Sequence, residues 1–345
     1  MLRSLPAASP TPRRGGILFS SVKGRPQMLL TQSAWRRVRV RAENKGTDTE
    51  GLQASWHTLP DGMRLEKIEM SSSFSPSSYP PLLFVHGSYH GAWCWTELFG
   101  PYFSNLGYDV VAISMRGQGN SDKGDLKVAG TLQSHVDDLA SVIASFDRPP
   151  VVVAHSFGGL LLEAYCSLQQ NMGNRPKIAG ACLVAAVPPA GNKEIITRIT
   201  KKSLLKSMRI TWGFISKSFR KDADACRELF FSEDLAEDRL LEYQAKLAQC
   251  SDVALLDVRK LSSQVPLPPL DESIFVDGSI RAFVGGGTND CVVDPPAVEE
   301  AAAYFGVTPV LWDNMAHDVM LDTRWERVAE DIDTWMKESF SVTHT

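Results

Sequence analysis

The sequence lacks the cysteine pattern of disulfide-rich and zinc-binding proteins. Its six cysteines are scattered along 345 residues, and no two of them form a C-x-x-C pair. We interpret them as small buried side chains of a protein from a reducing compartment. The sequence implies no metal and no cofactor. No internal repeat is visible, so a solenoid or propeller is excluded, and the chain is long enough for one large α/β core with an insertion.

The first 45 residues are poor in acidic side chains, with ten Lys or Arg against Glu43 alone. This Arg-rich, Ser-bearing composition is typical of an organelle transit peptide, and the alternative is a disordered basic tail. The apolar stretches in this segment are too short for a secretory or membrane-spanning segment. Because it holds ten of the 36 basic and one of the 40 acidic residues, its removal changes the formal charge from −4 to −13. The remaining domain is therefore not a nucleic-acid binder.

The most informative stretch is residues 151–162, VVVAHSFGGLLL. A short β-branched run breaks at Ser156, and a helical segment follows at once, as in the turn that carries a catalytic serine. This turn requires small residues two positions before and after the serine. Gly158 fits the usual G-x-S-x-G pattern, whereas Ala154 replaces its first glycine. The alternative is a buried strand that leads into a helix, with Ser156 as an ordinary N-cap.

An upstream segment supplies candidate donors for an oxyanion. Residues 81–85 read as an apolar strand that ends at His86 and Gly87, where the backbone can approach a ligand closely. In this type of site, one N–H comes from the residue after the nucleophile and another from the loop after the third strand. The sequence therefore predicts the backbone amides of Phe157 and Ser88 as the oxyanion hole.

The acid and the base are expected in the chain order Ser, Asp, His. A strand is predicted over 280–284, and the loop beyond it runs from Gly285 to Asp290. Asp294 competes for the role of the acid, but Pro295 and Pro296 follow it, so we assign Asp294 to helix capping and Asp290 to the site. His317 leaves the last predicted strand, 309–312, and is the candidate base.

Strands and helices alternate along most of the chain. A hairpin is predicted over 56–70, further strands over 107–113 and 177–187, and helices over 131–146 and 324–336. We predict an α/β fold: a mostly parallel central sheet, built from 56–187 and 279–340, with helices on both faces. Residues 188–278 are predicted to form a helical lid, inserted before the strand that leads to the acid.

One part of the predicted lid is both basic and apolar. Residues 193–221 contain nine Lys or Arg and a single acid, Glu194. This composition suggests peripheral contact with an anionic membrane surface. The alternative is a lid whose apolar face only roofs the pocket. Both alternatives favour an apolar ester as the substrate.

From about residue 56 to 340 the chain resembles the α/β-hydrolase superfamily. More specifically, it is similar to the plant and algal plastid hydrolases of the chlorophyll dephytylase group. This similarity lies in HGSYHGAWCW (86–95), RGQGNSD (116–122), GTLQSH (130–135), the turn at Ser156 and HDVMLD (317–322).

The resemblance implies a serine esterase that cleaves the phytyl ester of chlorophyll, at the thylakoid membrane of the chloroplast, to chlorophyllide and phytol. It also implies the triad Ser156, His317 and Asp290. The alternative is an enzyme of the methylesterase or hydroxynitrile-lyase type, because a run similar to HGSYHGAWCW occurs in those enzymes as well. The RGQGNSD loop argues against this alternative. A non-catalytic receptor for an apolar ligand is the alternative from another class.

Overall fold

The computed structural model describes residues 52–71, 78–169, 175–250, 252–270 and 280–340. The predicted transit segment 1–45 lies outside the described residues. The main sheet contains β1 (Leu52–Thr58), β2 (Arg64–Met70), β3 (Leu82–Val85), β4 (Val110–Ile113), β6 (Val151–His155), β7 (Gly180–Val184), β9 (Arg281–Gly287) and β10 (Val310–Trp312). A second, small sheet pairs β5 (Val128–Gly130) with β8 (Ala254–Leu256).

The main sheet is mostly parallel, as predicted, and its strand order is β1-β2-β4-β3-β6-β7-β9-β10. β1 and β2 form the predicted hairpin, and β2 is antiparallel to β4. Every later neighbouring pair is parallel. Strands of a parallel sheet are covered on both faces, which explains why β3, β4, β6 and β7 are buried at every position.

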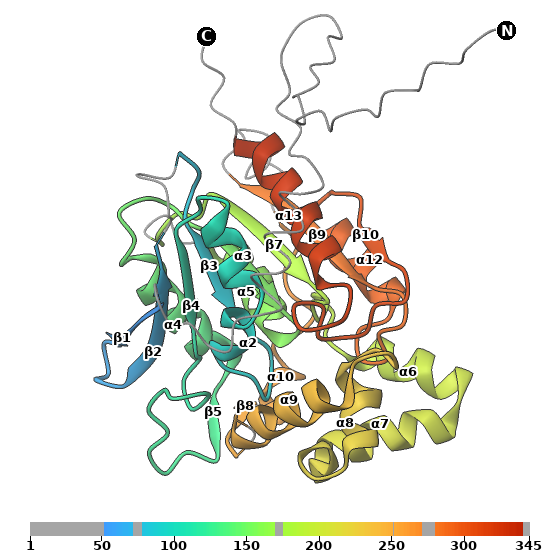
Figure 1. Cartoon of the computed structure of the whole chain (residues 1–345). Coiled ribbons are helices and arrows are strands. Elements are labelled where there is room, and N and C mark those ends of the chain that lie inside the picture. The colour runs from blue at the N-terminus through green and yellow to red at the C-terminus, as the bar shows by residue number, and fades with distance from the viewer. Residues whose placement is uncertain (1–51, 72–77, 170–174, 251, 271–279, 341–345) are drawn as a thin grey trace, which may run out of the picture. The chain divides into compact units, whose positions relative to one another are not determined.

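Helices follow most of the strands. They are α2 (Trp93–Thr96), α3 (Phe99–Asn105), α4 (Leu132–Ile143), α5 (Phe157–Gln169), α6 (Lys193–Lys202), α7 (Leu204–Ser216), η1 (Ser218–Arg220), α8 (Ala223–Phe230), α9 (Glu237–Cys250), α10 (Val258–Leu261), α12 (Pro295–Tyr304) and α13 (Trp325–Phe340). Figure 1 shows α3 and α13 on the near face of the sheet, while α6 to α9 lie together beyond its lower end.

The core divides into two apolar clusters, one on each face of the sheet. Alternate residues of a strand point to opposite faces, so Leu83 and Val85 join the cluster under α4, α5 and α12. Leu82 and Phe84 of the same strand join the cluster with α3 and α13. The second cluster continues into α8 and α9. The helices beyond the sheet therefore share a core with it.

Two sequence-based expectations were wrong in detail. β9 continues through Gly287, although residues 285–287 were expected in a loop. The segment 188–278 was expected to be a helical lid without clear strands, yet it contains β8, which pairs with β5 in register Val128 to Ala254. A strand of three residues is too short for its alternation to be visible in the sequence.

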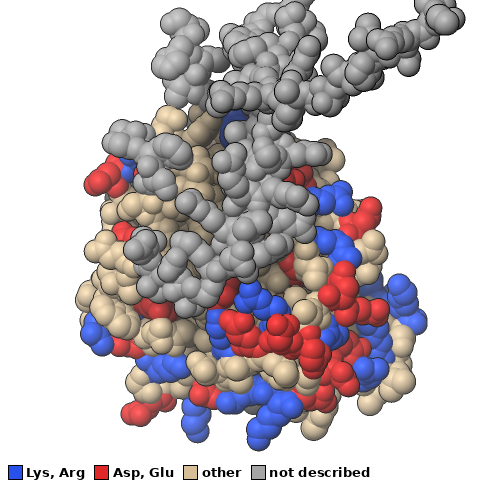
Figure 2. Space-filling model, viewed as in Figure 1, with Lys and Arg blue, Asp and Glu red and all other residues tan. Residues whose placement is uncertain are grey.

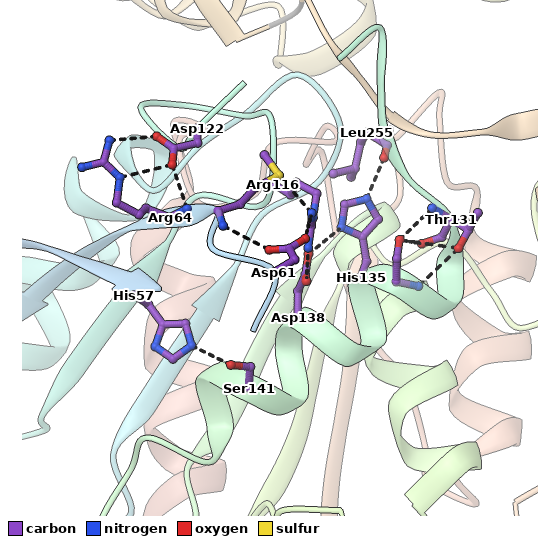
Figure 3. Close-up of polar contacts among 12 residues, drawn as sticks. His57, Asp61, Arg64, Arg116, Asp122, Thr131, His135, Asp138, Ser141 and Leu255 are labelled. Atoms are coloured by element: carbon purple, nitrogen blue, oxygen red, sulfur yellow. Dashed lines mark hydrogen bonds and ion pairs between the residues drawn. The ribbon is translucent and has the colours of Figure 1, made fainter. Parts of the chain in front are cut away.

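The segment RGQGNSD fastens the hairpin to the rest of the fold. Figure 3 shows Arg116 between Asp61, in the turn after β1, and Asp138 of α4. Nε and Nη2 of Arg116 donate to the two carboxylate oxygens of Asp138 at 2.9 and 2.7 Å. At the other end of the loop, Arg64 makes a similar bidentate pair with Asp122. Arg116 and Asp122, the two charged residues of this motif, therefore have structural roles that require no part in catalysis.

We predict that Arg116→Met lowers the free energy of unfolding by about 3 kcal/mol, because it leaves the carboxylate of Asp138 buried and unpaired. The side chain of Asp138 is 5% exposed. Arg64→Met is the matched control and should leave stability nearly unchanged, since the Arg64–Asp122 pair is exposed to solvent. Urea unfolding of both variants tests this. Equal losses of stability would contradict it.

Candidate active site

Ser156 lies on a strained turn between β6 and α5. Its φ angle is 54°, in the left-handed region that residues with a side chain rarely adopt. The turn packs closely on the loop after β3, because a Cβ atom added at Gly158 would lie 2.6 Å from the carbonyl oxygen of His86. The carbonyl oxygen of Ser156 accepts hydrogen bonds from the amides of Gly159 and Val187. The strand, turn and helix predicted around Ser156 are all present.

The three side chains predicted to form a triad lie within hydrogen-bonding distance. Nε2 of His317 is 3.0 Å from Oγ of Ser156. Nδ1 of His317 is 2.7 Å from Oδ2 of Asp290. All three residues are buried, with 5%, 3% and 6% of Ser156, His317 and Asp290 exposed. Nucleophile, base and orienting acid therefore stand in the order that acyl transfer requires.

Asp290 and Asp294, the two candidate acids, have different partners. Oδ1 of Asp290 accepts hydrogen bonds from the amides of Val292 and Val293, at 2.6 and 2.9 Å, which leaves Oδ2 for His317. Asp294 occupies the N-cap position of α12, but its side chain makes no capping hydrogen bond. Both of its oxygens instead bind the guanidinium of Arg198 on α6. The capping role predicted for the Asp294 side chain was therefore wrong.

The loops that carry Asp290 and His317 are bonded to each other. The amide of Asn289 donates to the carbonyl oxygen of Met315 at 3.0 Å. A Cβ atom at Gly287 would lie 2.2 Å from that same oxygen, so only glycine permits this approach. Glycine is therefore required at position 287 of β9, where the loop after β10 passes close to the strand.

The histidines around Ser156 have different electrostatic environments. Burial disfavours the charged form of His317, but the Asp290 carboxylate and its hydrogen bond outweigh this effect and raise the pKa of His317 above 6.5. Burial lowers the pKa of His155 well below this value and that of His86 to about 3. His317 is therefore suited to accept a proton, whereas His86 and His155 stay neutral.

The two backbone amides predicted to form the oxyanion hole lie in the loop after β3 and directly after Ser156. Neither the amide of Ser88 nor that of Phe157 donates a hydrogen bond to another group of the described residues. His86 holds the first of these loops, since one ring nitrogen accepts from the amide of Met115 and the other contacts the carbonyl oxygen of Gly87. The two amides are available to a ligand.

A second group of buried side chains connects the oxyanion loop with the loop of the base. His90 contacts the carbonyl oxygen of Ser88 through Nδ1, at 2.8 Å, and Oδ2 of Asp318 through Nε2, at 2.8 Å. Nε2 of His155 donates to the carbonyl oxygen of His317 at 3.0 Å. The sequence-based prediction gave Asp318 no role, although its position directly after the candidate base was a signal.

Ligand atoms of His90, His155 and Asp318 all lie within 4.8 Å of one another, which is a spacing that a metal ion could use. Nε2 of His90 already binds Asp318 and Nε2 of His155 binds a backbone carbonyl, whereas Nδ1 of His155 and Oδ1 of Asp318 have no hydrogen-bond partner among the described residues. We therefore assign this trio to the hydrogen-bond network around the loops.

Aromatic side chains lie next to the site. Tyr89, next to Ser88, stacks on Phe214 of α7 with ring centroids 5.9 Å apart, and its ring centroid is 5.0 Å from that of Phe219, with the two rings tilted by 57°. Phe230 of α8 lies 6.5 Å from the ring of His317. A separate cavity of about 1080 Å³ touches Asp290 and Asp294, but neither Ser156 nor His317 lines it. Its lining is rich in charged residues.

Comparisons with known proteins show similarity to hydrolases. A family profile described as "Alpha/beta hydrolase family" matches residues 82–331. Methylesterase 2 of Arabidopsis thaliana is 29% identical over 178 residues, which cover 50% of this chain and 64% of that protein. Esterase PIR7B of Oryza sativa subsp. japonica is 31% identical over 125 residues, which cover 35% and 44%. The chain thus spans less than two thirds of the length of these relatives.

Solved structures share the fold at low identity. An esterase from Exiguobacterium antarcticum has a TM-score of 0.58 at 17% identity, and the match covers 83% of this chain and 100% of that one. Together with the family profile, this confirms the fold class predicted from the sequence. The similarity to the chlorophyll dephytylase group is not among these findings.

We predict that Asp290→Asn lowers the pKa of His317, because the substitution removes the carboxylate that raises it while burial still disfavours the imidazolium. Asp294→Asn is the control and should leave the pKa of His317 unchanged, since Asp294 binds Arg198. Titration of the histidine ring nitrogens by NMR measures both. If only the Asp294 variant lowered the pKa of His317, Asp294 and not Asp290 would be the carboxylate that orients His317.

Proposed function

The chain belongs to the α/β-hydrolase family, and on this basis we propose that it is a carboxylic ester hydrolase in which Ser156, His317 and Asp290 form the catalytic triad. The observation that carries this proposal is the pair of contacts at His317, 3.0 Å to Oγ of Ser156 and 2.7 Å to Oδ2 of Asp290. The two relatives described above, a methylesterase and an esterase, support the reaction class.

In the proposed mechanism, Oγ of Ser156 attacks the ester carbonyl while Nε2 of His317 takes its proton. The Asp290 carboxylate stabilises the imidazolium that forms, in keeping with the raised pKa of His317. His317 then protonates the leaving alcohol, and an acyl-enzyme remains on Ser156. Water, activated by the same histidine, hydrolyses this intermediate and releases the acid.

The negative charge of the tetrahedral intermediate needs preorganised donors. We assign this role to the amides of Ser88 and Phe157, which donate to no other group of the described residues. The Ser88 loop is fixed from both sides, by His86 and by the His90–Asp318 pair. Such fixing matters because donors that must reorganise during the reaction lose much of their effect.

For the alcohol part of the substrate, we propose an apolar group, and the phytyl ester of chlorophyll remains the specific prediction from the sequence motifs. The aromatic side chains near His317 and the Ser88 loop suit an apolar ester better than a charged one; they are Tyr89, Phe214 and Phe230. Location in the chloroplast, at the thylakoid, stays a prediction, because residues 1–45 lie outside the described part of the chain.

Hydrolysis of a methyl ester is the second candidate, and the similarity to Methylesterase 2 favours it. The RGQGNSD loop no longer counts against this candidate, because Arg116 and Asp122 make structural ion pairs there. A non-catalytic receptor is less consistent with the site, since a receptor needs neither the strained serine nor its contact with His317.

Ser156→Ala should reduce ester hydrolysis by about 10⁴-fold or more, because the acyl-enzyme can no longer form. Ser141→Ala is the matched control, since this serine lies on α4 and binds His57 instead of the triad. Hydrolysis of p-nitrophenyl butyrate by both purified variants tests the prediction, and circular dichroism checks their folding. Full turnover by the Ser156 variant would exclude the serine mechanism.

Chlorophyll, pheophytin and an aromatic methyl ester distinguish the candidate substrates. If the alcohol is phytyl, the wild-type chain should release phytol from at least one pigment, and the Ser156→Ala variant should not. Separation of the pigments and alcohols by chromatography measures this. Cleavage of the methyl ester alone would replace the phytyl assignment by the methylesterase assignment and leave the triad intact.

A further inference from the structure

Helix α7 exposes a continuous row of large apolar side chains. Leu205 and Ile215 are 70% exposed and Trp212 is 66% exposed, which is unusual for residues of this size. With 100° per residue, all the exposed apolar positions of α7 fall within about one third of the helix circumference. They are Leu204, Leu205, Met208, Trp212 and Ile215. We call this set the α7 stripe.

The α7 stripe is separate from the face by which α7 joins the protein. Ser207, Ile210 and Gly213 are buried, and a Cβ atom at Gly213 would lie 3.0 Å from Cδ1 of Leu229 on α8. Phe214 adds the stacking contact with Tyr89. The helix therefore has two apolar faces, one packed and one open. Intramolecular packing accounts for the first face alone.

Basic side chains precede the α7 stripe. Lys201 and Lys202 end α6, immediately before α7. Both are exposed, and neither makes an ion pair with an acidic residue in the described part of the chain. In Figure 2, Lys and Arg side chains lie along the lower right edge, where Figure 1 draws α6 and α7.

We propose that the α7 stripe docks on an anionic lipid bilayer, with the apolar side chains in the interfacial region and Lys201 and Lys202 against the headgroups. No helix of the described residues is long and apolar enough to cross a bilayer, so the contact is peripheral. Trp at the level of the headgroups and Lys beside an apolar face are the features of such helices.

Charge selects the bilayer over a second copy of the chain as the occupant. In a symmetric dimer through the α7 stripe, the unpaired lysines of both copies would come together and repel each other. An anionic surface provides the opposite charge, and each lysine near it contributes favourably. The proposal concerns this surface and does not depend on the chemistry at Ser156.

The position of Trp212 allows a direct test with the full chain. Vesicles of phosphatidylcholine and phosphatidylglycerol that contain brominated acyl chains should quench part of the tryptophan fluorescence. Trp212→Phe should remove that quenched part. The control is Trp56→Phe, because Trp56 is 49% exposed on β1, outside the α7 stripe, and the quenching should survive there. Quenching that persists in the Trp212 variant overturns the proposal.

Affinity for the vesicles tests the contributions of the apolar side chains and of the lysines separately. The combined substitution Leu205→Gln, Met208→Gln and Ile215→Gln should weaken flotation with anionic vesicles by more than about tenfold. Lys201→Gln and Lys202→Gln should each weaken it about fivefold, with no effect on vesicles of phosphatidylcholine alone. Leu241→Gln, on exposed α9, and Lys127→Gln are the matched controls and should bind as the wild type does.

Hydrolysis of soluble p-nitrophenyl butyrate should be equal in all these variants, so a failure of the docking proposal is distinguishable from a failure of the esterase proposal. Equal binding of the stripe variant and the wild type overturns the docking surface. A dimer of the wild type in sedimentation equilibrium that the stripe substitutions dissociate overturns it in favour of a second copy.

Discussion

The left-handed backbone at Ser156 is the constraint on which the site depends. It turns the chain from β6 into α5 so sharply that neighbouring segments must approach it without side chains. Gly158 lies against the carbonyl oxygen of His86, and a Cβ atom at Gly87 would lie 2.6 Å from Cβ of Ser156. Ala154, by contrast, is a fully buried member of the apolar core below the turn. Its methyl group is thus accommodated in the core, and Ser156 keeps a φ of 54°.

The strained turn alone would not form a site, because the other groups come from loops far away in the sequence. Parallel strands bring these loops to one edge of the sheet. Hydrogen bonds between the loops then fix their spacing: Asn289 to Met315 joins acid and base, and His90 to Asp318 joins the base to the oxyanion loop. The bond between His90 and Asp318 is buried, so it holds its loops more firmly than an exposed contact would.

The sequence was sufficient for the parts of the structure that are determined locally. Ser156, Asp290 and His317 stand in strand–loop contexts that are visible as runs of residues, and the structure brings all three together. What the sequence did not reveal depends on distant partners. Asp294 binds Arg198, which is 96 positions away in the sequence. The residues next to Asp294 could therefore not show that its side chain forms this ion pair instead of capping the helix. Gly287 seemed a loop residue because strands disfavour glycine, yet the crossing of the Met315 carbonyl requires it there.

The same helix that carries the proposed docking surface also contacts the loop of the proposed oxyanion hole. The ring of Phe214 on α7 stacks on Tyr89, next to the proposed oxyanion donor Ser88. Docking of the α7 stripe would bring this helix into contact with the phase in which an apolar ester dissolves. The proposed lipid contact and the proposed oxyanion loop would then be joined by one helix, whose packed face contacts Tyr89 and whose open face contacts lipid.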